Sequence, residues 1–353
     1  MDKQAPRRTG TGGNAHVAVS SYDVAQLAGV SQSAVSRCFR PGSSISAKTR
    51  LRVLEAAREL GYAPNAMASG LITKRTNLVA VLISNLTNLY YPEVLAEMTR
   101  RLSDRGIRVL LFALAAEGEI DTVLDQVWRY RFDGAIAALR LSPDHLRDFA
   151  RRRVPVVLYN RFGEGEAVPS VCCDSVGGER QLVDRLLAAG HRVFGIISGP
   201  EDSYVSRERV RGARERLEEL GHSALIAQGS FDYHSGNAGL HALMAQSHGK
   251  LDALICANDL MAIGAIDCAR NDFALKVPDD LSIVGFDGVA PAMWSSYQLS
   301  TIRQPVRRMT QAAVDMLLER IGDPDLPPEV RTFAGVLIEG SSARLVARTE
   351  HSL

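Results

Sequence analysis

The stretch Tyr22–Arg40, YDVAQLAGVSQSAVSRCFR, has the pattern of two short helices joined by a tight turn. Small and apolar residues fall where two such helices would touch; they are Val24, Ala25, Ala28, Val30, Val35 and Cys38. Gly29 stands where the turn requires a positive φ, and Ser31 is placed to cap the second helix. This spacing predicts a helix-turn-helix, whose second helix can enter a DNA major groove.

A third helix is predicted directly after this pair. Beyond a loop at Pro41 and Gly42, Ser46 begins the run SAKTRLRVLEAARELGY, which Gly61 ends. Apolar residues recur along it at helical spacing, namely Leu51, Leu54, Ala57 and Leu60. Three helices with a small shared core make a minimal DNA-binding headpiece.

The run from Tyr22 to about Leu71, in which VSRCF is followed by SAKTRLRVLEAARELGYAPN, resembles the headpiece of the lactose-repressor (LacI/GalR) family of bacterial transcription regulators. In that family the second helix of the headpiece reads operator bases. The resemblance implies that Gln32, Ser33 and Arg37 read bases, and that Ser31 and Ser36 contact phosphates.

The segment PNAMASGLITKRTNL joins the headpiece to the rest of the chain. Asn65 can cap a short helix that runs through Leu71, but Ser69 and Gly70 weaken it, so we expect it to fold only when docked. In the resembling family this is the hinge helix, which pairs with its copy and inserts a leucine into the minor groove; here that residue is Leu71. The alternative is that Leu71 packs on its own domain as a linker residue.

Charge is divided unevenly along the chain, whose net charge is +1. Residues 1–76 hold 11 Lys or Arg against 4 Asp or Glu, whereas residues 77–353 hold 30 against 36. The first part therefore carries +7 and the second −6. A basic headpiece on a mildly acidic body suits phosphate neutralisation by one domain, and it predicts salt-sensitive DNA binding.

Length and composition indicate a large core, because 46% of the 353 residues are hydrophobic. No apolar run of about 18 residues predicts a membrane span, and MDKQAPRRTGTGGNAH lacks the apolar centre of a secretory signal. We therefore expect a cytoplasmic protein with a disordered N-terminal tail. The five cysteines are odd in number and lack CxxC spacing, so we expect buried reduced thiols and neither a metal site nor a cofactor.

From Leu78 onward, apolar runs alternate with amphipathic stretches. LVAVLI, RVLLFAL, DGAIAAL and VPVVLY form one set of predicted strands, and HRVFGII, SALIAQ, LDALIC and LSIVGF form a second. Near-continuous apolar strands separated by helices predict parallel sheets covered on both faces. We expect an α/β, two-lobed, periplasmic-binding-protein-like domain after the all-α headpiece, with a ligand cleft at the carboxyl ends of the strands.

These patterns divide the chain into a disordered tail (1–19), a helix-turn-helix domain (20–63), a hinge helix and linker (64–76), an effector-binding and dimerisation domain (77–340) and a C-terminal tail (341–353). The resembling family links its two lobes by three crossovers, which we place near Cys173, Arg303 and Phe333. The first lobe would then comprise about 77–173 and 304–332, and the second about 174–303 and 333–340.

Polar residues after predicted strands indicate where the cleft lies. Asn258 follows LDALICA, Asp287 follows LSIVGF, and Arg209 lies shortly after the strand that ends at Ser198. An Asn-Asp pair after a strand is most often only a helix cap. The resemblance assigns Arg209 as the arginine that forks onto the effector, with Asp287 and Asn258 bonding its hydroxyls or ring atoms; Arg207 is the competing arginine.

The resemblance also implies an aromatic floor at Phe231, in GSFDYHSG, and a first-lobe wall at Tyr90 and Tyr91, in NLYYPEV. Three departures from the family's pattern change the polar groups of the cleft: Leu89 stands where proline is usual, Tyr90 and Tyr91 stand where the family often has two Phe, and Asn160 stands where Asp is frequent. A sugar or sugar acid is the expected effector, because Arg209 suits either a pair of hydroxyls or a carboxylate.

Motifs of several enzyme classes are missing from the sequence, which has no G-x-x-x-x-G-K-[ST], G-x-S-x-G or H-E-x-x-H. We therefore expect a DNA-binding regulator, most simply a repressor, rather than an enzyme. The alternative is a periplasmic-type sugar-binding protein without a DNA role, which would have no use for a headpiece. A homodimer is expected on a pseudo-palindromic operator, since two headpieces on one body read a palindrome.

Overall fold

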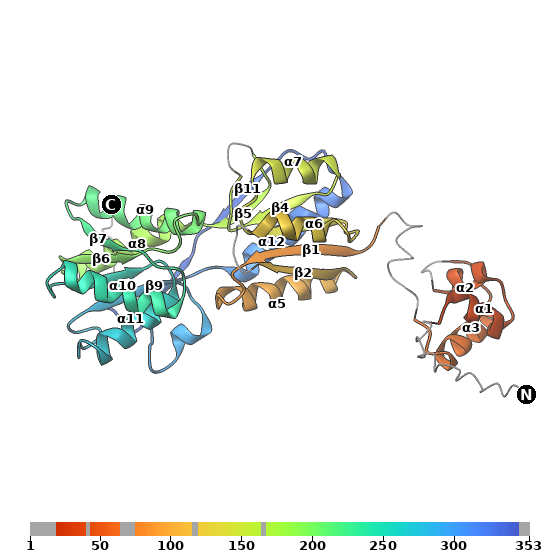
Figure 1. Ribbon diagram of the computed structural model, residues 1–353, viewed down its shortest axis with the longest axis horizontal. Helices are drawn as coiled ribbons and strands as arrows, with labels where there is room; N and C mark the ends of the chain where they lie inside the picture. The colour runs from red at the N-terminus through yellow and green to blue at the C-terminus, as the bar shows by residue number, and fades with distance from the viewer. Residues whose placement is uncertain (1–18, 40–42, 64–74, 115–118, 164–166, 346–353) are drawn as a thin grey trace, which may run out of the picture. The chain divides into compact units, whose positions relative to one another are not determined.

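The computed structural model describes residues 19–39, 43–63, 75–114, 119–163 and 167–345, and the chain divides into two compact units, 1–76 and 77–353. The first unit is the headpiece and the second is the body (Figure 1). The predicted fold class, a helical headpiece and two α/β lobes, is confirmed.

Three helices form the headpiece: α1 (Ser21–Ala28), α2 (Gln32–Cys38) and α3 (Ala47–Glu59). The side chain of Ser20 accepts from the backbone N–H of Asp23, whose carboxylate in turn accepts from the backbone N–H of Ser20, so α1 begins with a capping box. Gly29 ends α1 with φ of 60°, which opens the turn into α2. Ser31 then caps α2 by accepting from the N–H of Ala34.

The headpiece core centres on Val24, Val35 and Val53, which are fully buried. The expectation for α3 was wrong in one respect: Leu51 and Leu54 are 62% and 42% exposed. The buried face of α3 holds Val53 together with two alanines, Ala56 and Ala57. Successive residues of a helix are rotated by about 100°, so Leu54, one position after Val53, and Leu51, two positions before it, point away from the buried face.

The first lobe of the body is a six-stranded sheet in the order β11-β5-β4-β3-β1-β2, with every pair parallel. Its strands are β1 (Leu78–Ser84), β2 (Arg108–Leu114), β3 (Gly134–Ala138), β4 (Val156–Tyr159), β5 (Ser170–Cys173) and β11 (Val330–Phe333). Its helices are α5 (Tyr90–Ser103), α6 (Ile120–Val127), α7 (Pro143–Arg151) and α12 (Val306–Gly322). Alternate residues of β1 pack on the α5 and α12 side and on the α6 and α7 side, so both faces are covered.

The second lobe has the order β12-β10-β9-β8-β6-β7 and is parallel except where β12 pairs with β10. Its strands are β6 (Phe194–Ile197), β7 (Ala224–Ala227), β8 (Ala253–Cys256), β9 (Ser282–Asp287), β10 (Ser300–Arg303) and β12 (Val336–Ile338). Its helices are α8 (Ser175–Ala188), α9 (Tyr204–Glu219), α10 (Tyr233–Gln246) and α11 (Asp259–Asn271), with a 3-10 turn at Ala290–Met293. Helix α8 pairs with α9, and α10 pairs with α11.

The chain passes between the lobes three times. It leaves the first sheet after β5, returns through α12 after β10, and leaves again between β11 and β12. Because every strand of the first sheet and nearly every strand of the second is parallel, the loops at their carboxyl ends gather at one edge of each sheet. Ligands of open α/β sheets bind at such edges.

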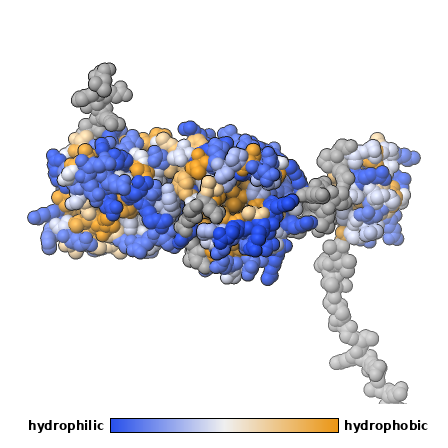
Figure 2. Space-filling view, turned by 90° about the horizontal axis from the view of Figure 1, so that it is seen from above, coloured by the Kyte–Doolittle hydropathy of each residue, from blue (hydrophilic) through white to orange (hydrophobic). Residues whose placement is uncertain are grey.

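The surface of the body in Figure 2 is mostly hydrophilic, with hydrophobic areas on both lobes. Among the described residues, exposed apolar side chains occur on edge strands of both sheets, for example Leu111 on β2 in the first sheet and Ile226 on β7 in the second. No helix in the described part of the chain is long and apolar enough to cross a membrane.

Candidate ligand and DNA sites

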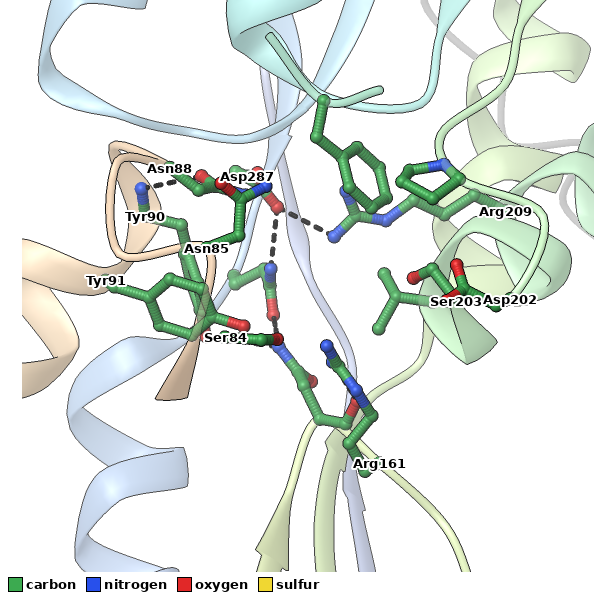
Figure 3. A pocket seen from close by; sticks show the side chains of 15 residues that line it. Ser84, Asn85, Asn88, Tyr90, Tyr91, Arg161, Asp202, Ser203, Arg209 and Asp287 are labelled. Carbon is green, nitrogen blue, oxygen red and sulfur yellow. Dashed lines mark hydrogen bonds and ion pairs between the residues drawn. The ribbon is translucent and has the colours of Figure 1, made fainter. Parts of the chain in front are cut away.

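A cavity of about 270 Å³ lies between the two lobes of the body, at the carboxyl ends of their strands. Its walls include Ser84, Asn85, Asn88, Tyr90, Tyr91, Asn160 and Arg161 from the first lobe, Pro200, Asp202, Ser203, Val205, Arg209, Phe231 and Asp287 from the second, and Gln304 from a crossover. Figure 3 shows these side chains pointing toward a common space from both lobes. The cavity thus combines aromatic rings with a dense set of hydrogen-bonding groups.

The second-lobe wall is built around an ion pair between Arg209 and Asp287. A guanidinium Nη2 donates to Asp287 Oδ1 at 2.7 Å, and the two side chains are only 3% and 4% exposed. The other Nη donates to the carbonyl of Ala257 at 2.5 Å, and the guanidinium lies over the ring of Phe286, 4.0 Å from its centroid. Arg209 is therefore fixed in one orientation at the cavity wall.

Asp287 ends β9 with φ of 122°, a conformation rare for a residue with a side chain. This backbone aims its carboxylate at Arg209 and at the cavity. Burial raises the pKa of Asp287, while the neighbouring guanidinium opposes that shift. A strained residue beside a cavity indicates a functional position.

A hydrogen-bonded chain joins the lobes through Gln304. The Gln304 amide donates to Asp287 Oδ1 at 2.7 Å, and its carbonyl accepts from Asn160 Nδ2 at 2.7 Å. Asn160 also donates to the hydroxyl of Tyr90 at 3.3 Å, and that hydroxyl bonds Tyr159 at 3.1 Å. The chain runs from the second-lobe ion pair to the first-lobe core, so a ligand that displaces any member disturbs both lobes.

Burial raises the pKa of both Tyr90 and Tyr159, so both phenols keep their protons at physiological pH. Asn160 has φ of 51° and accepts from the backbone N–H of Cys173 at 3.0 Å. Its carbonyl oxygen is held by the start of a crossover, which leaves the amide nitrogen facing Gln304 and Tyr90. Asparagine suits this position because it donates to two oxygens that an aspartate could not serve.

Phe231 lines the cavity from the loop after β7, with φ of 63°. A Cβ added at Gly199 would lie 2.3 Å from its ring, so the ring occupies space that only glycine leaves open. Asn258 does not line the cavity: its Oδ1 accepts from the N–H of Met261 and its Nδ2 donates to the carbonyl of Phe231, both at 3.0 Å. Asn258 is therefore a helix cap, which also anchors the backbone that carries the aromatic ring.

The two competing arginines take different places. Arg207 is exposed and donates to the carbonyls of Glu201 and Asp202 at 3.1 Å each, whereas Arg209 lines the cavity. Tyr91 lines the cavity and donates its hydroxyl to the carbonyl of Ala138 at 3.3 Å. Of the predicted effector residues, the structure gathers six around one space and leaves Asn258 behind Phe231.

Sequence reasoning missed several lining residues, notably Gln304, Arg161 and the pair Ser84–Asn85. All of them end or follow a strand: Ser84 ends β1, Arg161 lies two residues after β4, and Gln304 follows β10. The rule that selected Asp287, a polar residue at the carboxyl end of a strand, would have found them had it been applied to every strand.

The candidate DNA-reading surface is one side of α2. Ser33 and Arg37 are exposed there, and Arg37 Nε approaches the carbonyl of Ser33 at 3.4 Å. Gln32 is half-buried, and its side-chain amide donates to the hydroxyl of Ser21 on α1 at 3.2 Å. To reach a base with this amide, Gln32 has to give up that hydrogen bond. Ser31 is exposed beside Ser33, with their hydroxyls 2.9 Å apart, and Ser36 is half-buried. Leu71 lies outside the described residues.

Each of the two units matches a known protein family. Residues 21–65 match the family described as bacterial regulatory proteins, lacI family, and residues 183–343 match the periplasmic binding protein-like domain. The HTH-type transcriptional regulator AscG of Escherichia coli K12 is 31% identical over 332 residues, which is 91% of this chain and 97% of AscG.

Two solved structures extend the likeness over the whole fold. A lac repressor dimer bound to operator and the anti-inducer ONPF is 27% identical, covers 93% of this chain and 100% of its own, and has a TM-score of 0.82. The complex of the transcriptional regulator CelR with cellobiose is 29% identical, covers 92% and 99%, and has a TM-score of 0.70. The chain belongs to the LacI family of bacterial transcriptional regulators.

Proposed function

We propose that this protein is a repressor whose affinity for a pseudo-palindromic operator is set by a small polar effector, a sugar or sugar derivative, bound between the lobes. The observation that carries the proposal is the interlobe cavity with Arg209, Asp287, Asn160 and Gln304 on one hydrogen-bonded chain. Such a chain can exchange its internal bonds for bonds to ligand hydroxyls without leaving buried groups unsatisfied.

The cavity walls suit the two kinds of surface that a sugar ring presents. Phe231, Tyr90 and Tyr91 offer aromatic faces and edges for C–H groups, while Asn85, Asn88 and the Arg209–Asp287 pair offer donors and acceptors for hydroxyls. The CelR structure holds cellobiose, which makes oligosaccharides a sensible first class of probe. A carboxylate on the sugar would compete with Asp287 for Arg209.

The DNA role is proposed for residues 20–63, with α2 as the reading helix. Ser33 and Arg37 would contact base edges, Gln32 would join them by leaving Ser21, and Ser31 and Ser36 would bond phosphates. The net charge of +7 on residues 1–76 supplies the sequence-independent part of the affinity. In the linker 64–76, we propose that Leu71 acts as the minor-groove wedge.

We propose that the protein acts as a homodimer, because two headpieces are needed to read a palindrome at cellular salt. The lac repressor structure is a dimer on its operator. Exposed apolar side chains on the outer edge strands, such as Leu111 and Ile226, offer surface for subunit contact.

Two further assignments follow from the regulator role. The protein works where chromosomal DNA is, so we place it in the cytoplasm, and its relatives are transcription regulators rather than enzymes, so we assign it no catalytic activity. The alternative of a periplasmic-type sugar-binding protein leaves residues 21–65, which match the regulatory headpiece, without a purpose.

The test begins with a thermal-shift screen of cellobiose, other sugars, sugar acids and nucleobases. Operator affinity, measured by fluorescence anisotropy on a site selected from random palindromes, is then followed while the best compound is titrated. We expect Arg209→Ala to lose the effector response, because it removes charge-assisted hydrogen bonds worth roughly 1.5 to 3 kcal/mol each.

The matched control is Arg207→Ala, two residues away on α9, which removes an equal charge from an exposed position outside the cavity. It should respond at the wild-type midpoint. If Arg209→Ala also responds at that midpoint, the effector is held elsewhere and the site assignment is wrong.

A further inference from the structure

A second cluster of reactive side chains lies outside the interlobe cavity, where α10 packs on α11. His241 projects from α10, Cys268 projects from α11, and Asp272 is the C-cap of α11, four residues after Cys268. A ring nitrogen of the imidazole, the thiol Sγ and a carboxylate oxygen all lie within 4.8 Å of one another. In the described part of the chain this is the one group of three such donors that converges in this way.

The cluster is already organised around the Asp272 carboxylate. His241 Nε2 lies 2.9 Å from Asp272 Oδ2, and the amide of Asn237 donates to the same oxygen at 3.4 Å. Hydrogen bonds from His241 and Cys268 lower the pKa of Asp272, which keeps it ionised. The ring centroids of Phe273 and His241 lie 4.9 Å apart, so the two rings are in contact. Three side chains, those of Asn237, His241 and Cys268, thus form hydrogen bonds to the Asp272 carboxylate.

From this arrangement we propose that His241, Cys268 and Asp272 bind one divalent transition metal ion, of the class of Zn²⁺ and Co²⁺. Imidazole, thiolate and carboxylate are the ligand types that such ions take, at bonds of about 2.0 to 2.3 Å. Those lengths place the ligand atoms of a tetrahedral ion about 3.3 to 3.7 Å apart, which lies between the present 2.9 Å separation of His241 Nε2 from Asp272 Oδ2 and the 4.8 Å limit of the cluster. Three protein ligands leave a fourth position for water.

The site needs no backbone rearrangement, because its members differ in their freedom to move. Cys268 is only 1% exposed and fixed in the core, whereas His241 and Asp272 are exposed and can turn toward it. Asp272 caps α11 with helical backbone angles, so its i,i+4 spacing from Cys268 puts both on the side that faces the helix carrying His241. A bound ion would tie α10 to α11.

Binding exchanges a proton for the metal. The thiol S–H bond breaks, a metal–sulfur bond forms, and the proton leaves to solvent, while neutral His241 binds through Nε2 with its proton on Nδ1. No oxidant or reductant is needed. Because the ion replaces the thiol proton, it binds more tightly as pH rises.

The sequence offered no sign of this site, because the cysteines lack paired spacing and no metal site was expected. Only one cysteine takes part; its partners come from the C-cap of the same helix and from a helix more than 20 residues earlier. The fold alone brings them together.

The test is a titration of untagged, reduced full-length protein with Co²⁺, followed by absorbance. We expect one ion per chain, visible d–d bands of a tetrahedral site and a near-ultraviolet thiolate-to-cobalt band, all bleached by Zn²⁺. His241→Ala, Asp272→Asn and Cys268→Ser should each weaken binding by at least the roughly 10 to 100-fold that loss of a ligand's neighbour costs. Zn²⁺ should also raise the thermal midpoint of wild type but not of His241→Ala.

His234→Ala is the control, an exposed histidine two turns earlier on the same helix. It should keep the wild-type spectrum and affinity. Since Cys268 is a core residue and its variant can fail to fold, the exposed pair His241 and Asp272 provides the decisive variants. A thiolate band that is absent in wild type, or unchanged in His241→Ala, would overturn the site.

Discussion

Glu179, on α8, is a buried carboxylate that the effector chemistry does not use. It is 1% exposed, and neither of its carboxylate oxygens has a hydrogen-bond partner among the described residues. It packs against α9, where a Cβ added at Gly212 would lie 3.2 Å from its own Cβ. Burial raises the pKa of Glu179 to about 8, although Arg209 on α9 opposes the shift.

This predicts a pH dependence of stability with a definite sign. Between about pH 4.5 and 8 the folded protein holds a proton on Glu179 that the unfolded chain has released, so the free energy of unfolding falls as pH rises. The slope is at most about 1.4 kcal/mol per pH unit. In Glu179→Gln this loss is absent, so the variant should gain thermal stability over wild type progressively from pH 5 to 8.

The control is Glu219→Gln. Hydrogen bonds from Arg180 and Arg216 lower the pKa of Glu219 to about 2, so its contribution is present above the unfolded value of 4.5 and is lost only as the pH falls toward 2. The difference in thermal stability between Glu219→Gln and wild type should stay constant from pH 5 to 8. A flat difference for Glu179→Gln as well would show that Glu179 is ionised throughout.

Residue types and strand ends were readable from the sequence, but side-chain partners were not. Arg209 and Asp287 stood out as polar residues after predicted strands, the family resemblance added Asn160 and Phe231, and the structure places all four at the cavity. Asn258 carried the same signal yet serves as a cap, because whether a polar group faces ligand or backbone depends on where neighbouring loops run. No local pattern distinguishes the two outcomes.

Among the helices and strands, α2 is the one expected to read DNA bases. Arg37 is exposed on the side of α2 that also carries Ser33. A bidentate contact of Arg37 to guanine would discriminate against other bases by roughly 1 to 3 kcal/mol. We expect Arg37→Ala to lose operator preference while non-specific DNA binding weakens only mildly, measured by anisotropy on matched and scrambled sites across salt concentrations.

Arg58→Ala tests whether charge alone explains such a result. Arg58 is an exposed arginine of the last turn of α3, so its loss removes the same charge from the same unit. It should weaken matched and scrambled sites equally and leave their ratio unchanged. An unchanged ratio in a folded Arg37→Ala protein would refute base reading by Arg37.

The headpiece also shows why helix spacing is a weaker guide than small residues. In α1 and α2 the glycine turn and alanines identified the touching faces, since only small side chains allow such close approach. In α3 two stripes satisfied helical spacing, and the larger leucines, Leu51 and Leu54, suggested the wrong one. Ala56 and Ala57 beside Val53 mark the packed face, which hydrophobicity alone underrates.

For the whole molecule, alternation of apolar strands and helices was enough to predict two α/β lobes, because parallel strands need covered faces and crossover helices. The periodicity of the sequence did not predict strand order, although the family resemblance placed a crossover near Phe333: β11 and β12 come last in the chain yet join the edges of different sheets. Their separation makes the crossovers, and one of these carries Gln304 into the cavity. The residue that links the lobes therefore depends on topology rather than on a motif.

The crossover residue Gln304 should transmit the effect of effector binding to operator affinity. Operator and effector must change each other's affinity by the same factor, typically 5 to 150-fold. An effector that closes the lobes moves the first lobe, whose β1 begins at Leu78 directly after the linker 64–76. Gln304→Leu keeps the side chain's bulk but removes its hydrogen bonds to Asn160 in the first lobe and Asp287 in the second. A movement of one lobe would then no longer be transmitted to the other through this residue.

We expect the coupling factor of Gln304→Leu to fall toward 1, with operator affinity of the free protein near that of wild type. Gln246→Ala, an exposed glutamine at the end of α10, should retain the full factor. The factor is obtained by titrating operator at zero and saturating effector, then effector with and without operator, because only agreement of both directions measures coupling rather than lost binding. A wild-type factor in Gln304→Leu would mean that the lobes communicate through contacts other than this hydrogen-bonded chain.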